Sequence, residues 1–163
     1  MYELIKFLHV ASVFLFLLSH GASANVSFQL KNERKPERIR ALLDLSNWSF
    51  IGMGVGFLLL LITGIIDSFA GPWADHNGWI WVSIGLLLAI TVSMSVLGSM
   101  FYTKVRAAVG VPPYKRSDQQ ALGETKSEEE IAKLLNTNQP IILSLIGFGG
   151  ILIIAYLMMF KPF

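Results

Sequence analysis

The sequence predicts an all-α protein, a polytopic membrane bundle of four helices built by a single integral-membrane domain over residues 1–163. The 163-residue chain is 53% hydrophobic, with a mean hydropathy of +0.57. Only 15% of its residues are charged, compared with about 25% in an ordinary soluble domain. Its apolar residues gather into long segments. A segment of roughly 20 such residues crosses a bilayer as a helix, because a helix pairs all of its own backbone groups.

Composition excludes several kinds of site and partner. The chain has no cysteine, so disulfide bonds, thiolate metal sites, iron–sulfur clusters and cysteine nucleophiles are excluded. The formal net charge is +2, and the basic residues stand in the connections between apolar segments instead of covering one face of a soluble domain. We therefore expect the lipid bilayer to surround the chain, and we expect no nucleic acid as a partner.

Four segments are long and apolar enough to span a membrane, and they cover residues 4–24, 48–69, 79–102 and 140–160. The second helix should begin well before its span. Pro36 suits the first turn of a helix, where its missing N–H is not needed. From this proline, "PERIRALLDLSNW" runs into the span without a helix breaker. We expect a long helix that starts outside the bilayer and continues through it.

Basic residues orient the four spans. The connection between the first two spans contains Lys31, Arg34, Lys35, Arg38 and Arg40. The connection over residues 103–139 contains Lys104, Arg106, Lys115, Arg116, Lys126 and Lys133. The middle connection, "AGPWADHNG", contains no Lys or Arg. Because basic loops stay on the cytoplasmic side, we expect a multi-pass protein of the cell (cytoplasmic) membrane with both termini outside.

The first span has a second interpretation, as a cleaved signal peptide. The small residues "ASA" at positions 22–24 follow an apolar run, as a signal-peptidase site does. However, the amino-terminal "MYELIK" is not clearly basic. Removal of this span would also place both basic connections outside the cell, against the orientation rule. We therefore expect the first span to be retained.

The long connection over residues 103–139 contains one helical pattern. In "SEEEIAKLLNTN", Ser127 and Glu130 have the spacing of a capping box, in which each side chain bonds the backbone of the other residue. Ile131, Leu134 and Leu135 would then lie on one face of a short helix. We expect this helix to pack over the cytoplasmic end of the bundle, in preference to serving as a dedicated partner site.

The first helix carries a narrow polar face. At about 100° per residue, six positions fall within one sector: His9, Ser12, Phe16, His20, Ser23 and Ser27. Polar groups inside a bilayer need partners, so this face should point toward the other helices. The two histidines are separated by about 16 Å along the helix axis. We expect His9 to lie in the outer half of the membrane and His20 to lie near its inner boundary.

The outer histidine has two candidate partners. Asp67 is the carboxylate of the second span, one turn from its outer end, and His76 lies in the outer connection. A haem b could be held between His9 and His76, and a metal ion could be held by His9, Asp67 and His76. Two alternatives stay open. His9 could be a neutral ring bonded to a serine or a carbonyl of another helix, and His76 could be an ordinary surface residue.

The inner histidine has candidate partners of a different chemistry. Met53 and Met94 stand at the depth of His20, and histidine with methionine is a ligand pair for haem and for copper. The sequence has three histidines, so one monomer holds at most one haem with two histidine ligands. Glycines nearby, in "GMGVG" and "GFGG", permit close helix contacts or make room for a flat cofactor.

The quoted features resemble those of a known group of proteins. "LIKFLHVASVFLFLLSHG", a basic connection with "ERIRALL" and a "TG" late in the second span resemble a widespread group of small predicted integral-membrane proteins. That group is similar to the copper-resistance-D-like membrane domain and, more distantly, to the membrane protoporphyrinogen oxidase of bacteria. His9 matches their early histidine, and Thr63–Gly64 matches their "TG". Where those relatives have "WxG" after the histidine, this chain has "VFLF".

Three functions follow from these residues. The favoured one is a small haem- or metal-binding membrane protein, active in electron transfer or porphyrin chemistry, with His9 as first ligand and His20 as second. The alternatives are a copper or small-solute permease and a non-catalytic accessory subunit of a membrane complex. The protein could also be a homo-oligomer. A classical hydrolase is not expected, because no serine, histidine and carboxylate stand together at one membrane depth.

Overall fold

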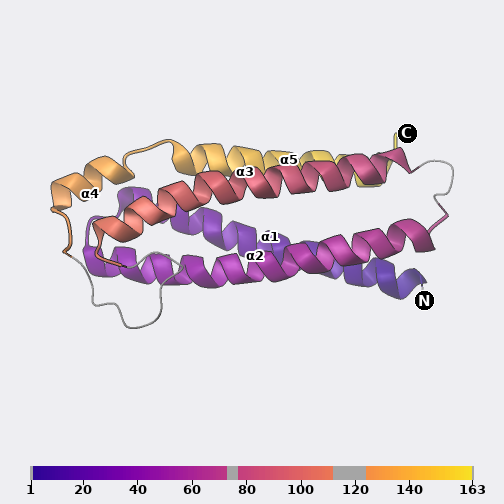
Figure 1. Ribbon diagram of the computed structural model, residues 1–163, viewed down its shortest axis with the longest axis horizontal. Helices are drawn as coiled ribbons and strands as arrows, with labels where there is room; N and C mark the ends of the chain where they lie inside the picture. Colours follow the sequence, from indigo (N-terminus) through magenta and orange to yellow (C-terminus); the bar gives the residue numbers. More distant parts are fainter. Residues whose placement is uncertain (1, 73–76, 112–123, 163) are drawn as a thin grey trace.

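The computed structural model describes residues 2–72, 77–111 and 124–162. Five helices occupy these ranges: α1 (Tyr2–Asn32), α2 (Pro36–Ala70), α3 (Gly78–Ala108), α4 (Glu128–Leu135) and α5 (Gln139–Phe160). The four long helices lie side by side along the molecule, as Figure 1 shows, and the short α4 lies at one end. Both chain termini lie at the opposite end. These two ends are called the α4 end and the terminal end below.

The predicted all-α bundle is confirmed. Four helices are long and apolar enough to cross a membrane, and the described ranges contain no strand. α2 begins at Pro36, as its proline predicted. The helices extend beyond the expected spans, since α1 continues to Asn32 and α3 continues to Ala108. The additional turns of both helices lie at the α4 end (Figure 1).

The long helices are arranged as two closely packed pairs. α1 packs along α2 and α3 packs along α5, whereas the two pairs contact each other much less. Glycine allows the α1–α2 approach. A Cβ atom added at Gly56 would lie 2.8 Å from the backbone nitrogen of Phe16 and 2.9 Å from its Cα. Gly56, one of the small-residue positions predicted for close helix contact, therefore serves that purpose here.

A hydrophobic core holds the α4 end together. It contains side chains that are almost wholly buried, from α1, α2, α3, α4 and the residue after α3: Val26, Leu30, Ile39, Leu43, Phe101, Tyr102, Val105, Ala108, Val109, Ile131 and Leu135. α4 has the predicted capping box. The Glu130 N–H donates to Ser127 Oγ over 3.3 Å, and the Ser127 N–H donates to Glu130 Oε2 over 3.2 Å. The expected packing of α4 onto the end of the bundle is confirmed.

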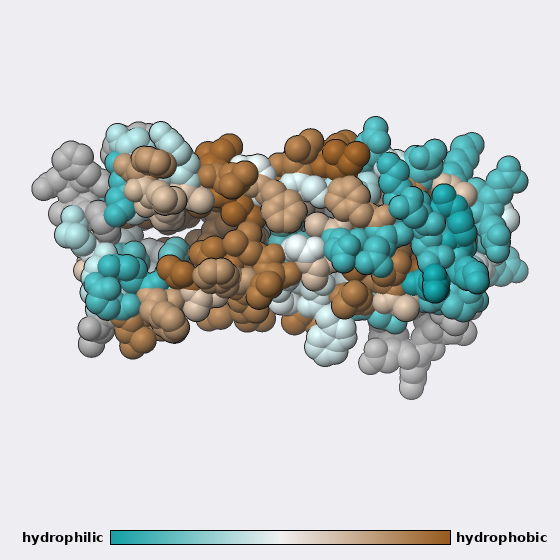
Figure 2. Space-filling model, turned by 180° about the vertical axis from the view of Figure 1, so that it is seen from behind, coloured by the Kyte–Doolittle hydropathy of each residue, from teal (hydrophilic) through white to brown (hydrophobic). Residues whose placement is uncertain are grey.

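The surface changes character along the molecule. Figure 2 shows hydrophilic residues gathered most densely at the α4 end, which is on the right in that view, and hydrophobic residues over most of the middle of the molecule. Many large apolar side chains point outward from the long helices, among them Phe14, Leu18, Leu145 and Leu152. An apolar surface of this extent is suited to lipid and not to water.

Candidate functional site

The predicted polar face of α1 points into the bundle. Ser12, His20, Ser23 and Ser27 are buried, and His9 and Phe16 are half-buried. On the same helix, Phe7, Phe14 and Leu18 are exposed. The inward orientation inferred from helical spacing is thus confirmed.

The serines of this face are satisfied mainly within their own helix. Ser12 Oγ donates to the Leu8 carbonyl and Ser27 Oγ donates to the Ala24 carbonyl, each over 2.7 Å. Serine hydroxyls inside helices often bond the preceding turn in this way. Among the described residues, no serine bonds either α1 histidine. The partners of the two histidines must therefore come from elsewhere.

His9 is held by a threonine of α2. Its Nδ1 lies 3.1 Å from Thr63 Oγ1, and Thr63 Oγ1 lies 2.6 Å from the Leu59 carbonyl oxygen. A carbonyl only accepts, so the threonine hydroxyl hydrogen goes to Leu59 and the hydroxyl oxygen accepts from His9. The ring is thus protonated at Nδ1. Nε2 then keeps a lone pair, and the Leu60 carbonyl of α2 also lies near the ring.

The neighbouring glycine provides the space for this ring. A Cβ atom on Gly64 would lie 3.1 Å from Cε1 of His9, closer than most carbon contacts in proteins. Thr63 and Gly64 therefore act together, one by bonding the imidazole and the other by giving it room. These are the "TG" residues noted in the sequence, and the structure brings both of them into contact with His9.

A cavity of about 290 Å³ lies between the helix pairs at His9. All four long helices line it, and apart from His9 and Ser83 its lining is apolar. The α5 residues Met158 and Met159 are part of this lining. Their thioethers were not among the residues singled out from the sequence. We call this space the outer cavity, because it lies toward the terminal end.

The predicted metal ligands at this depth are only partly described. Asp67 lies one turn beyond Thr63 on α2. Its Oδ1 is buried and has no hydrogen-bond partner among the described residues. His76 falls outside the described residues, so its pairing with His9 or Asp67 stays a prediction. Within ranges 2–72, 77–111 and 124–162, no three His, Asp or Glu side chains form a metal-binding group.

His20 occupies a second position between the helix pairs. Its side chain is 4% exposed. The ring stacks with Phe16 at a centroid distance of 6.2 Å and meets Phe148 of α5 at 4.8 Å. Its Nε2 is buried without a hydrogen-bond partner in the described part of the chain. The ring lies against Gly147, where a side chain would collide with Nε2.

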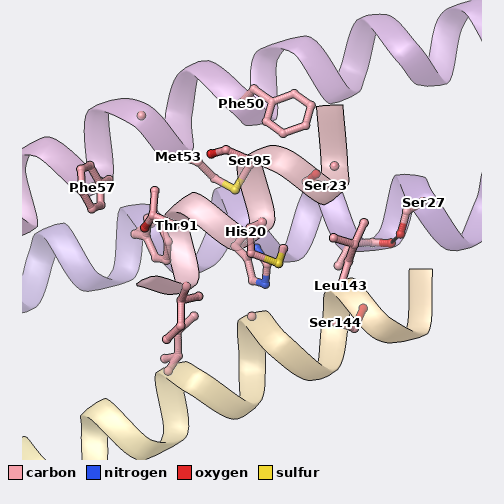
Figure 3. Close-up of a pocket in the computed structure, with 18 of the residues that line it drawn as sticks. His20, Ser23, Ser27, Phe50, Met53, Phe57, Thr91, Ser95, Leu143 and Ser144 are labelled. Atoms are coloured by element: carbon pink, nitrogen blue, oxygen red, sulfur yellow. Dashed lines mark hydrogen bonds between the residues drawn. The ribbon is translucent and has the colours of Figure 1, made fainter. Parts of the chain in front are cut away.

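A cavity of about 190 Å³ lies beside this histidine. We call it the inner cavity. Met53 and Met94 line it together with His20, so the structure brings the three inner candidates to one place. Figure 3 shows His20 near the middle of this space, between Met53 of α2 and Ser144 of α5. Ser144 Oγ is a second buried atom without a hydrogen-bond partner among the described residues.

The two cavities lie end to end between the helix pairs. Phe16 of α1 and Ile151 of α5 line both of them. His9 belongs to the outer cavity and His20 to the inner one, so the two histidines face separate spaces at different depths. They cannot ligate one common metal ion, because about 16 Å of helix separates them.

Comparisons with known proteins give a family and no described function. No curated protein and no solved structure matches the chain. One family model, described as a predicted integral membrane protein (DUF2269), matches residues 3–162. This range contains α1 from its second residue onward and the whole of α2, α3, α4 and α5. With nearly its whole length matched, the chain belongs to the DUF2269 family of predicted integral membrane proteins.

Proposed function

We propose that this protein binds a haem or a transition-metal ion within the membrane, with His9 as its first protein ligand. The observation that carries the proposal is the hydrogen bond from His9 Nδ1 to Thr63 Oγ1. Ligating histidines nearly always donate their other ring N–H to a fixed acceptor, which sets the tautomer and the direction of the ligating nitrogen. His9 has such an acceptor, and its Nε2 is left with a lone pair.

The surroundings of His9 support the proposal. An ionisable residue inside a membrane is costly and is usually retained for a function. The outer cavity is lined almost entirely by apolar side chains, which exclude water from a bound group. Asp67, one turn beyond Thr63 on α2, would partly neutralise a bound cation. Met158 would supply a thioether, a ligand suited to haem iron and to copper.

The size of the outer cavity distinguishes a metal ion from a haem as the ligand. An apolar cavity of roughly 150 Å³ accommodates one benzene molecule. The outer cavity, at about 290 Å³, is ample for a metal ion with its protein ligands. A porphyrin is several times larger than benzene, so it would need the space of both cavities and a movement of Phe16 and Ile151. The fit is thus direct for a metal ion, and for haem it requires the helix pairs to separate further.

A bound haem or copper ion would supply one-electron chemistry. The residues of this chain would supply the rest of the site. Thr63 fixes the tautomer of His9, Gly64 gives the ring its position, and the apolar lining keeps water away. Electron transfer and porphyrin chemistry both require a group held in this way.

A spectrum and a metal analysis of detergent-purified protein test the proposal. Protein expressed with a supply of haem precursor should show a Soret band, or protein expressed with added copper should carry the metal. Either signal should be lost in His9→Ala. Ser12→Ala is the matched control, because Ser12 lies on the same face of α1 and bonds only its own helix. The absence of both the Soret band and bound copper would contradict the proposal. If the protein also purified together with other membrane proteins, the accessory-subunit function would be favoured.

One observation favours a copper permease as the second candidate. His9, Met158 and Met159 line one cavity near the terminal end, where soft ligands could receive Cu(I). In cells, this function predicts a copper content that depends on His9 and on Met158. An unchanged copper content after deletion of the protein would exclude transport, while leaving metal binding by the purified protein untouched.

We also propose that the α4 end faces the cytoplasm and that both termini lie outside the cell. The described basic residues of the two connections are concentrated at the α4 end, where Lys31, Arg34 and Lys35 follow or border the end of α1. Basic connections remain on the cytoplasmic side. Reporter enzymes fused to the carboxyl terminus test this orientation. Alkaline phosphatase should be active there, and an active cytoplasmic reporter at that terminus would reverse the topology.

A further inference from the structure

The inner cavity contains polar groups that the proposed function does not use. His20 Nε2 on α1 and Ser144 Oγ on α5 are both buried, and neither has a hydrogen-bond partner among the described residues. A buried polar atom without a partner costs roughly 1–3 kcal/mol. Both side chains line the same cavity of about 190 Å³. Two unpaired groups beside one space indicate that something else completes their hydrogen bonds.

The two groups converge on one face of α5. The His20 ring lies against Gly147, and Ser144 stands three residues earlier on that helix. Residues with this spacing are neighbours on a helix surface. In Figure 3, Ser144 projects from α5 on the side where His20 lies. One oxygen atom placed beside Gly147 could therefore bond both groups.

The rest of the cavity suits a flat ring. Phe16, Phe50, Phe57 and Met53 line it, and such side chains pack against planar groups. A cavity of roughly 150 Å³ holds a benzene molecule, so about 190 Å³ holds a six-membered ring with small substituents.

The cavity also reaches the lipid-facing surface. Gly54 of α2 and Ser95 of α3 line it, and both are exposed. A side chain added at Gly54 would meet no atom within 4 Å. α2 and α3 belong to different helix pairs and contact each other little. An apolar tail attached to a ring in the cavity could pass between these helices into the bilayer.

We propose that the inner cavity binds a lipid-soluble quinone, with one ring oxygen held by His20 and Ser144. A neutral histidine is suited to both forms of such a ligand. With Nε2 protonated it donates to a quinone carbonyl, and with Nε2 unprotonated it accepts from a quinol hydroxyl. Ser144 can donate or accept in the same way. The binding site is separate from His9 and does not rest on the proposed haem or metal function.

Titration with decylubiquinone tests the proposal on protein in lipid nanodiscs, with tryptophan quenching as the readout. Wild-type protein should bind it saturably, and Ser144→Ala should bind it about tenfold more weakly, the effect of one lost hydrogen bond. Thr91→Val is the matched control. Thr91 lines the same cavity, but its hydroxyl already bonds the Leu87 carbonyl, so this variant should bind like the wild type.

Two further variants test whether the quinone occupies the inner cavity and whether its binding is independent of His9. Gly98→Leu fills the cavity at a position with no atom within 4 Å, so it should abolish binding without altering a polar group. His9→Gln should leave quinone binding unchanged, whether or not it loses a haem or a metal. Absence of saturable binding by the wild type would overturn the proposal. The proposal would also be overturned if Ser144→Ala bound decylubiquinone as tightly as the wild type does. It would be overturned as well if the wild type bound decylbenzene, which has the tail but no oxygen, with the same affinity. Ordered water would then satisfy the His20 and Ser144 groups.

Discussion

At the α4 end, four helices meet around side chains that are almost wholly buried, whereas further along the bundle two cavities separate the helix pairs. Leu30, Leu43 and Leu135 are 0% exposed at the α4 end. Between the helix pairs, by contrast, buried polar atoms of His20 and Ser144 border open space. One bundle thus contains a close-packed region and a loosely packed one.

The two surroundings explain this difference. At the α4 end, where hydrophilic residues gather on the surface, apolar side chains gain by leaving water, and close packing follows from the hydrophobic effect. Inside the bilayer, lipid tails are as apolar as a leucine, so no such force closes a gap between helices. Glycine contacts hold α1 to α2 there, and the space between the helix pairs remains available for a ligand. Stability should thus depend mainly on the first region and binding on the second.

The largest expected effect is at the α4 end. Leu43→Ala removes a side chain that is 0% exposed, and comparable core truncations lower the free energy of unfolding by about 2–5 kcal/mol. Leu152→Ala is the matched control, because that side chain is 70% exposed toward lipid. Reversible unfolding in mixed micelles measures both. Equal losses would show that the close-packed region does not dominate stability.

Thr63→Val should weaken ligand binding in the outer cavity about 10- to 100-fold, as the loss of a fixed acceptor for a ligating histidine commonly does. The valine keeps the shape of threonine but cannot accept from His9 Nδ1. Thr91→Val makes the same chemical change where the hydroxyl bonds only its own helix, so it should retain affinity. Titration of copper or haem into purified apoprotein gives the dissociation constants. Unchanged affinity in Thr63→Val would remove the main support for His9 as a ligand.

Gly56→Ala tests the α1–α2 contact inside the bilayer. The new methyl group would lie within 3 Å of the Phe16 backbone, which cannot yield as a flexible side chain does. We expect a loss of about 1–3 kcal/mol in stability, as for other overpacked contacts. Gly54→Ala, two residues away, meets no atom within 4 Å and should be neutral. Thermal unfolding in detergent compares them, and indistinguishable midpoints would show that the helix pair is not held by close contact.

Much of the fold was predictable from sequence patterns within single helices. Hydropathy predicted four spans, Pro36 predicted the start of α2, and the spacing of Ser127 and Glu130 predicted the cap of α4. Helical periodicity likewise predicted that His20 points inward. Each of these depends on the order of residues along one element, and the structure confirms each one.

The contacts between helices were less predictable. Thr63 was noted only through its resemblance to a known "TG", and its bond to His9 depends on how α1 and α2 are aligned. Met158 was missed because it is one apolar residue among many in α5, although its position near the terminal end matches the depth of His9. The pairing of α3 with α5 was not predicted from the residue pattern of either helix.

The smallest expected effect is the response of α4 to pH. The N–H and hydroxyl of Ser127 bond the Glu130 carboxylate and lower the pKa of Glu130 below its ordinary value of 4.5. A lowered pKa in the folded state means that the carboxylate contributes stability above pH 4.5 and loses it as the pH falls through the folded value. Hydrogen exchange of the α4 amides should therefore accelerate, relative to its intrinsic rate, as the pH falls below 4.5. Glu130→Gln should lack this dependence, and the same pH response in that variant would assign the effect to another group.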